Sequence, residues 1–158
     1  MKRSSSNMSI TLLLTLTLVN SAIAELSPFT KFHVKIVNLL PSNKSPLVAH
    51  CKSKDNDLGI KSLPTNGETQ WGFRVDFLNS TLFFCSLSFS HGGRVHRAVF
   101  DVFRAKEEFV TDFCGYNTCT WIAQEDGIHA YNSKTEVSHL VYLWTDGGSD
   151  DISPAADL

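Results

Sequence analysis

Apolar and polar residues alternate along residues 70–77, and shorter versions of this pattern recur through most of the chain. In this segment Trp71, Phe73 and Val75 are separated by single glycine or charged residues, and Phe77 continues the series. Alternation with a period of two predicts a β-strand that buries one face, here the face with the aromatic residues. No segment has a helical period of useful length, and at most a single helical turn is expected over residues 105–110. The chain is therefore predicted to fold mainly from β-strands.

The predicted strands are short and are separated by turn signals at intervals of roughly ten residues. Besides residues 70–77, the segments with this character are 32–36, 47–51, 83–89, 95–103, 119–123, 128–131 and 137–144. Asp126-Gly127 is the strongest hairpin signal, because both central positions of a tight turn favour residues that tolerate positive φ. The pattern predicts an all-β fold, an antiparallel two-sheet β-sandwich of seven or eight strands, with a partly closed barrel as the alternative. Its expected aromatic core is Trp71, Phe73, Phe83, Phe89, Phe100 and Trp121.

Residues 1–24 have the three parts of a secretory signal peptide. Lys2 and Arg3 give a positive start, an apolar run covers residues 10–19, and Ala22-Ile23-Ala24 provides small residues for cleavage before Glu25. The apolar run is about ten residues long, whereas a membrane-spanning helix needs about twenty. The sequence thus predicts a secreted, extracellular protein with no membrane insertion after signal cleavage.

All four cysteines, Cys51, Cys85, Cys114 and Cys119, follow the predicted cleavage point. An even number of cysteines in a small secreted chain predicts two disulfides, and three pairings can be drawn. A Cys114–Cys119 bridge together with Cys51–Cys85 is one of them, and the sequence does not choose among the three. Zinc binding by His50 and these cysteines fits less well, because only Cys114 and Cys119 approach the usual spacing of ligands.

The charge of the chain is balanced except at its end. Removing Lys2 and Arg3 from the 14 basic residues leaves 12 against 16 acidic residues, a net charge of −4. Four of the acids lie in the last thirteen residues: Asp146, Asp150, Asp151 and Asp157. Residues 25–145 are therefore neutral overall and have no electrostatic feature for binding nucleic acid. We expect 25–145 to form one domain and 146–158 to be an acidic disordered tail.

No arrangement of residues predicts a catalytic, metal or cofactor site. Asp55-Asn56-Asp57 followed by Gly59 resembles a calcium loop, but the sixth and twelfth positions are Ile60 and Asn66 instead of glycine and glutamate. These residues are better explained as a polar turn. The chain has no G-x-S-x-G elbow, and its cysteines are expected to be oxidised, so no catalytic residue can be named. We therefore expect no enzyme activity, no metal and no cofactor.

Several short motifs occur together in one order. Residues 50–59 read HCKSKDNDLG, and the motifs that follow are Trp71-Gly72-Phe73, Phe83-Phe84-Cys85, Cys114, Cys119-Thr120-Trp121 and Glu125-Asp126-Gly127-Ile128. In order and spacing, across roughly residues 31–131, this set resembles the plant self-incompatibility S1 proteins, also termed S-protein homologues. Asn56 stands where the acidic cluster of that family often has aspartate.

The resemblance implies a small secreted plant protein with a β-sandwich fold that acts by binding. Founding members in poppy are stigma-secreted ligands that reject self pollen through a pollen membrane receptor, so the implied partner is a cell-surface receptor protein. We expect the protein to be a monomer. The alternative function is a carbohydrate- or cell-wall-binding module, which would need exposed aromatic residues; the candidates are Tyr116, Tyr131, Tyr142 and Trp144. A small secreted hydrolase is a third hypothesis and would need a cleft that joins a histidine to a serine or aspartate.

Loops at the ends of two packed sheets are expected to carry recognition, because the sheets hold them rigidly. The candidate loops are 52–58, 91–94 and 104–117, and their candidate partner-binding residues are Asp55, Asn56, Asp57, His91, Arg94, Glu107 and Glu108. Two sequons predict N-linked glycosylation at Asn43 and at Asn79. Asn79 lies in a turn between two predicted strands, where a glycan can extend into solvent.

Overall fold

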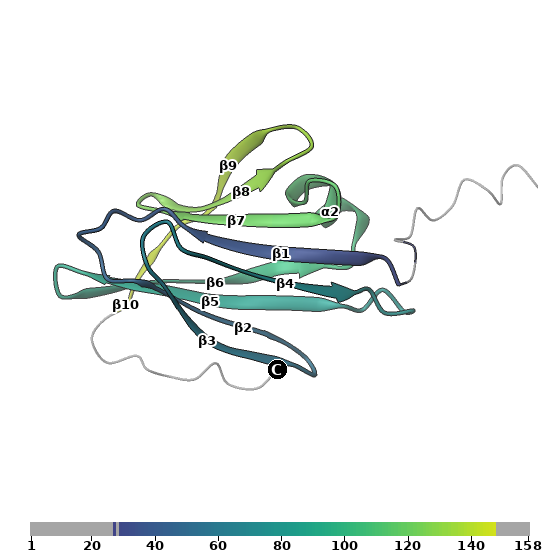
Figure 1. The fold of residues 1–158 in the computed structure, drawn as a ribbon, viewed down its shortest axis with the longest axis horizontal. Helices are drawn as coiled ribbons and strands as arrows, with labels where there is room; N and C mark the ends of the chain where they lie inside the picture. Colours follow the sequence, from purple (N-terminus) through teal and green to yellow (C-terminus); the bar gives the residue numbers. More distant parts are fainter. Residues whose placement is uncertain (1–26, 28, 148–158) are drawn as a thin grey trace, which may run out of the picture.

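The computed structural model describes residue 27 and residues 29–147. These residues form two five-stranded β-sheets, which Figure 1 shows as two layers, and one short helix at one end. The predicted signal peptide and residues 148–158 lie outside the described residues.

The chain passes from one sheet to the other several times. The first sheet has the spatial order β4 (Glu68–Arg74), β1 (Lys31–Asn38), β7 (Thr118–Gln124), β8 (Gly127–Asn132) and β9 (Val137–Tyr142). The second has the order β10 (Thr145–Gly147), β6 (Arg94–Arg104), β5 (Leu82–His91), β2 (Leu47–Ser53) and β3 (Asp57–Leu63). The helix, α2 (Glu107–Phe113), follows β6 and precedes β7.

Three features differ from the prediction. The described residues contain ten strands instead of seven or eight, because the pattern does not predict β3, which is mostly exposed, or β10, which is three residues long. The pairing is not purely antiparallel, since β1 and β7 run in parallel; the chain crosses to the other sheet between them, which is what parallel neighbours require. Asp146 and Gly147 belong to β10, so ordered structure continues past the predicted boundary at residue 145.

The core lies between the facing sides of the two sheets. Phe32 of β1 contacts Phe103 of β6 with ring centroids 5.0 Å apart, and Trp121 of β7 contacts Phe100 of β6 at the same distance. Trp121 is fully buried, and its Nε1–H donates to the Val102 carbonyl of the other sheet over 2.9 Å. The aromatic residues of the two sheets therefore hold the layers together.

Most of the predicted aromatic core is buried, and the predicted strand over residues 70–77 ends earlier than expected. Phe83, Phe89, Phe100 and Trp121 are buried, whereas Trp71 and Phe73 are half-buried and pack against the core. The prediction that Phe77 faces inward is wrong, because β4 ends at Arg74 and Phe77 lies in the following loop with 73% of its surface exposed.

The helix is longer and begins later than the single turn predicted over residues 105–110. It spans Glu107–Phe113, and Phe109 and Phe113, four residues apart, lie on the same side and contact Trp121. Phe109 is buried and Phe113 is half-buried against the core, and these contacts explain why the helix extends to Phe113. Within residue 27 and residues 29–147, no helix is both long and apolar enough to cross a lipid bilayer.

The cysteines form two disulfides, Cys51–Cys85 and Cys114–Cys119. The first joins directly opposed residues of β2 and β5 inside the core. The second closes a short loop between α2 and β7, with a sequence separation of 5. The first bridge thus lies within the second sheet, and the second fixes the end of α2 to β7 of the first sheet.

Candidate partner-binding surface

Three connections meet at the end of the two sheets where the helix lies, termed the α2 end: the β2–β3 turn (54–56), the β4–β5 loop (75–81) and residues 105–117. The strand register brings them together, because Ser53 of β2 lies beside Phe83 of β5, which lies beside Phe103 of β6. Figure 1 shows all three at the same end. Two of the three predicted recognition loops, 52–58 and 104–117, therefore share one surface.

The third predicted loop, 91–94, lies at the opposite end of the sheets. His91 and Arg94 face each other across the tight β5–β6 turn, whose Gly92 and Gly93 have φ angles of 58° and 77°. The Arg94 guanidinium lies 3.5 Å from the Asp146 carboxylate of β10. His91 and Arg94 therefore belong to a different surface from the other candidate residues.

The β4–β5 loop is held in one conformation by Asp76. Its carboxylate accepts hydrogen bonds from the backbone N–H groups of Ser80 (2.7 Å) and Thr81 (3.1 Å) and from both hydroxyl groups. The hydrogen bonds from Ser80, and then those from Thr81, hold the pKa of Asp76 below its usual range. The loop is thus fixed by its own side chains and does not need a partner to order it.

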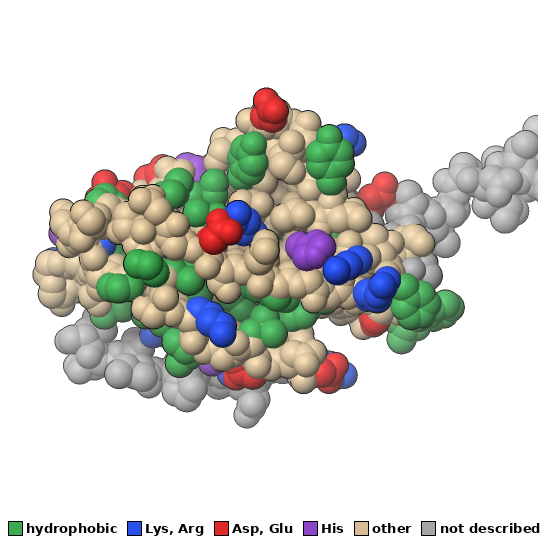
Figure 2. Space-filling model, in the orientation of Figure 1, with side chains coloured by type: hydrophobic (Ala, Val, Ile, Leu, Met, Phe, Trp, Pro, Cys, Tyr) green, Lys and Arg blue, Asp and Glu red, His purple; other side chains and the backbone are tan. Residues whose placement is uncertain are grey.

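This fixed loop presents apolar side chains to solvent. Phe77 and Leu78 are 73% and 81% exposed, and Phe29, whose backbone N–H bonds to the Val75 carbonyl over 3.0 Å, is 60% exposed. Phe29, Phe77 and Leu78 are termed the apolar patch. Figure 2 shows hydrophobic side chains beside Lys and Arg at this end of the molecule. Exposed apolar patches of this kind are typical of interaction sites.

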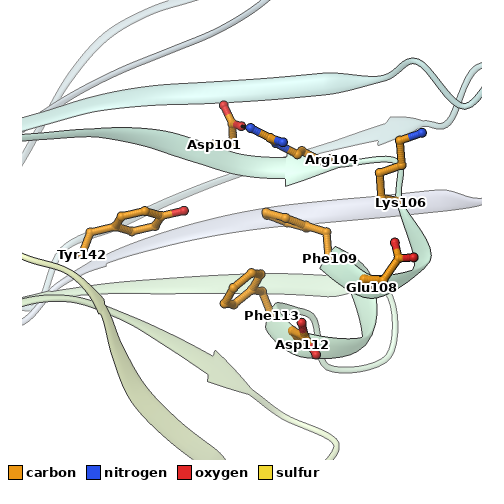
Figure 3. Close-up of a pocket in the computed structure, with 8 residues that line it drawn as sticks. All are labelled: Asp101, Arg104, Lys106, Glu108, Phe109, Asp112, Phe113 and Tyr142. Atoms are coloured by element: carbon orange, nitrogen blue, oxygen red, sulfur yellow. Dashed lines mark hydrogen bonds and ion pairs between the residues drawn. The ribbon is translucent and has the colours of Figure 1, made fainter.

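A hollow of about 350 Å³ lies between α2, β6 and β9 at the same end. Its lining residues are Asp101, Arg104, Lys106, Glu108, Phe109, Asp112, Phe113 and Tyr142, and Figure 3 shows Phe109 and Tyr142 extending toward each other across it. Asp101 and Arg104 form an ion pair. Burial, and then the Asp101 charge, raise the pKa of Tyr142, so its phenol stays protonated and can donate a hydrogen bond.

The two predicted residues of the helix have different surroundings. Glu108 lines the hollow, whereas Glu107 is exposed in the first turn of α2 and does not line it. Lys106 and the carboxylates of Glu108 and Asp112 make no ion pair with any described residue. These charges therefore remain free to contact a partner at the α2 end.

The acidic segment 55–57 forms a turn that leads into a strand. Asn56 donates its backbone N–H to the Ser53 hydroxyl over 3.1 Å, as expected for a polar turn, and Asp57 begins β3. The Asp57 carboxylate accepts hydrogen bonds from the Gly59 N–H (2.9 Å) and the His50 ring (2.7 Å), and the Lys52 ammonium lies at 3.1 Å. These three contacts, led by the Gly59 hydrogen bond, hold the pKa of Asp57 well below its usual range.

The low pKa of Asp57 predicts a dependence of stability on pH. A carboxyl group whose pKa is lower in the folded than in the unfolded chain stabilises the fold above its unfolded pKa of about 3.9, and this contribution is lost as pH falls through the folded pKa. We expect the stability difference between the wild type and Asp57→Asn to be constant near neutral pH and to shrink as pH falls below about 4. Denaturant unfolding of both proteins over a pH series measures this difference. A difference that grows on acidification would contradict the assignment.

The aromatic residues and histidines on which the alternative functions depend differ in their exposure and partners. Tyr131, Tyr142 and Trp144 are half-buried, and of the four aromatic candidates for carbohydrate binding Tyr116 is the exposed one. Three histidines pair with aspartates, His50 with Asp57, His96 with Asp146 and His129 with Asp126, and none of these rings bonds a described serine or cysteine. No group of three or more His, Cys, Asp or Glu side chains in the described part of the chain could hold a metal ion.

The sequence did not identify Phe77 and Leu78 as surface residues. The alternation from Trp71 to Val75 favours an inward position for Phe77. The sequence signal against this position is Asn79-Ser80, which is typical of a turn and begins two residues after Phe77. The sequons stay predictions: Asn43 is exposed, and Asn79 is half-buried with a positive φ of 51°.

Comparisons with known proteins agree with this fold. The family model of the plant self-incompatibility protein S1 matches residues 33–144. S-protein homolog 24 of Arabidopsis thaliana is 37% identical over 112 residues, 71% of this chain and 70% of the relative. S-protein homolog 6 of the same plant is 41% identical over 98 residues, 62% of this chain and 67% of the relative.

A solved structure of a self-incompatibility protein homologue is also similar. Its TM-score is 0.53 at 15% sequence identity, and the match covers 73% of this chain and 96% of the other. It is described as one of a widespread family of small, highly stable, secreted proteins from plants. From the family match over residues 33–144 and these relatives, it follows that the chain belongs to the plant self-incompatibility protein S1 family.

Proposed function

We propose that this protein is a secreted extracellular ligand that binds a cell-surface receptor protein through its α2 end. The observation that carries the proposal is the exposure of Phe77 and Leu78, at 73% and 81%, on a loop that Asp76 holds in one conformation. A rigid loop loses little conformational entropy on binding. Burial of its exposed apolar area therefore contributes more to the binding free energy than the same area on a flexible loop would.

Family membership and the predicted signal peptide support secretion. In this proposal the two facing sheets are a β-sandwich scaffold, which presents loops from both ends. Residues 25–145, extended by the last residues of β10, act as one domain and as a monomer. The apolar patch supplies the buried centre of the interface, and Lys106, Glu108 and Asp112 supply polar contacts around it.

Glycosylation at Asn79 and Asn43 is part of the proposal. Asn79 follows Leu78 directly, so a glycan there would limit the partner's approach on that side of the patch. Asn43 lies in the connection between β1 and β2, away from the α2 end, and a glycan there would leave the patch free.

The test is a comparison of two double variants in binding to plant membrane fractions. Phe77→Ser with Leu78→Ser is expected to weaken saturable binding by about tenfold or more, because central apolar residues carry most of the energy of an interface. The control is Ile60→Thr with Val99→Thr, which changes two exposed apolar residues on the outer face of the second sheet. Equal unfolding midpoints of the two variants establish that both are folded.

The control is expected to bind as the wild type does. Loss of binding in the Ile60/Val99 variant with full binding in the Phe77/Leu78 variant would contradict the proposal and assign recognition to the sheet face instead.

A further inference from the structure

A second cavity, of about 230 Å³, lies at the edge between the two sheets, and its lining includes no residue of the apolar patch. It is bordered by β3 and β4, the edge strands of the second and first sheets, which follow one another along the chain. Its lining residues are Ala49, Cys51, Leu58, Gly59, Lys61, Thr69, Gln70 and Trp71. The buried Ala49 and Cys51 form its inner part, so the cavity reaches the core.

A bulge in β3 makes room for this cavity. His50 pairs with Ile60 and Lys52 pairs with Asp57, so both Leu58 and Gly59 lie opposite Cys51. Gly59 has a φ of +72°, which a residue with a side chain rarely adopts, and a Cβ atom there would meet nothing within 4 Å. The bulge therefore leaves open space beside the Cys51–Cys85 disulfide.

Trp71 forms one wall and differs from the other tryptophans. The Nε1–H groups of Trp121 and Trp144 donate to backbone carbonyls over 2.9 and 2.7 Å. The Nε1–H of Trp71 is buried and has no acceptor among the described residues. A buried donor without an acceptor is costly, so the position of this indole is not stabilised by a hydrogen bond from its N–H group within the described residues.

Lys61 adds a positive charge to the same cavity. It pairs with Ala49, and directly paired residues of antiparallel strands project from the same side of the sheet. Since Ala49 faces the core, Lys61 extends on the inner side of β3. Its ammonium forms no ion pair with any described residue. An inward charge on an edge strand also discourages pairing with strands of other chains. An experiment must therefore distinguish ligand binding by Lys61 from protection of the strand edge.

We propose that the cavity binds a small aromatic carboxylate, with its ring against Trp71 and its carboxylate at Lys61. An engineered cavity of about 150 Å³ holds benzene, so the present one can hold a single ring with a short substituent. The face of the Trp71 indole and the apolar wall match the ring of such a molecule, and the unpaired Lys61 ammonium matches its carboxylate. Leu58, which belongs to the candidate loop 52–58, also lines this cavity, whereas no residue of the apolar patch does.

The test uses the indole N–H signals in the ¹H–¹⁵N NMR spectrum of the oxidised protein from Glu25 onward. Trp71→Phe assigns the Trp71 signal, and phenylacetate is the titrant, with neutral phenylacetamide as its matched control. We expect phenylacetate to shift the Trp71 signal saturably while the signals of Trp121 and Trp144 stay in place. Phenylacetamide is expected to bind roughly threefold to fivefold more weakly, as the loss of a solvent-exposed ion pair implies.

Two variants complete the test. Lys61→Met is expected to lower the affinity for phenylacetate by the same roughly threefold to fivefold factor and to leave phenylacetamide unaffected. Thr69→Phe, which fills the cavity, is expected to abolish the shift, and unchanged Trp121 and Trp144 signals report that this variant is folded. No saturable Trp71 shift with phenylacetate would overturn the proposal. Equal binding of acid and amide, or full affinity in Lys61→Met, would also overturn it and leave Lys61 as protection of the strand edge.

Discussion

Replacing Cys51 and Cys85 together by alanine is expected to lower the free energy of unfolding by about 4 kcal/mol. The bridge spans a sequence separation of 34, and the stabilisation by a disulfide grows with the length of the loop that it closes in the unfolded chain. The same relation gives about 2 kcal/mol for Cys114–Cys119, whose separation is 5. Urea unfolding of the wild type and the two double variants at neutral pH measures the difference.

The most specific part of this prediction is that removing Cys51–Cys85 lowers the free energy of unfolding more than removing Cys114–Cys119. Each variant removes one bridge and leaves the other, so each serves as the control of the other. A larger loss on removing Cys114–Cys119 would contradict the loop-length argument. It would indicate that the short bridge stabilises the folded α2 end itself.

The second large effect is expected for Trp121→Ala, a loss of about 3–5 kcal/mol in the free energy of unfolding. Trp121 is fully buried and contacts Phe100, Phe109 and Phe113, which belong to the other sheet and to α2. The change leaves a cavity between the layers and removes the hydrogen bond to the Val102 carbonyl. Thermal or urea unfolding checks the size of the loss.

Two further variants separate the contributions at Trp121. Trp121→Phe keeps an aromatic ring and loses the N–H donor. Its free energy of unfolding is therefore expected to lie between that of the wild type and that of Trp121→Ala. Tyr116→Ala removes an exposed aromatic side chain and is expected to change stability by no more than about 0.5 kcal/mol. A Trp121→Ala protein as stable as Tyr116→Ala would contradict the view that this residue joins the layers.

How far the sequence predicts the fold depends on how each strand is buried. Strands with one buried face, such as β1 and β5, carry a clear alternation, and the sequence predicts them well. β3 is an edge strand that exposes nearly every residue, so burial imposes no pattern on its sequence. The parallel pairing of β1 with β7 depends on how the chain crosses between layers, which local patterns do not contain.

The candidate surface was predictable only in part. Loops 52–58 and 104–117 were identified from the sequence, but their common location depends on the register of β2, β5 and β6. Alternation places Phe77 on the same face as Trp71 and Phe73, because the pattern alone does not reveal where a strand ends. The cavity beside Trp71 depends on a bulge and on the packing of two edge strands, and neither has a strong sequence signal.

The central claim is that this protein acts by binding a receptor protein, and saturation binding tests it most directly. Labelled, oxidised protein from Glu25 onward is titrated onto plant membrane fractions with and without prior protease treatment, and onto cell-wall glycans. The account predicts saturable binding to untreated membranes that protease treatment abolishes. Binding that survives protease treatment, or binding to glycans alone, would contradict it and favour a wall-binding function.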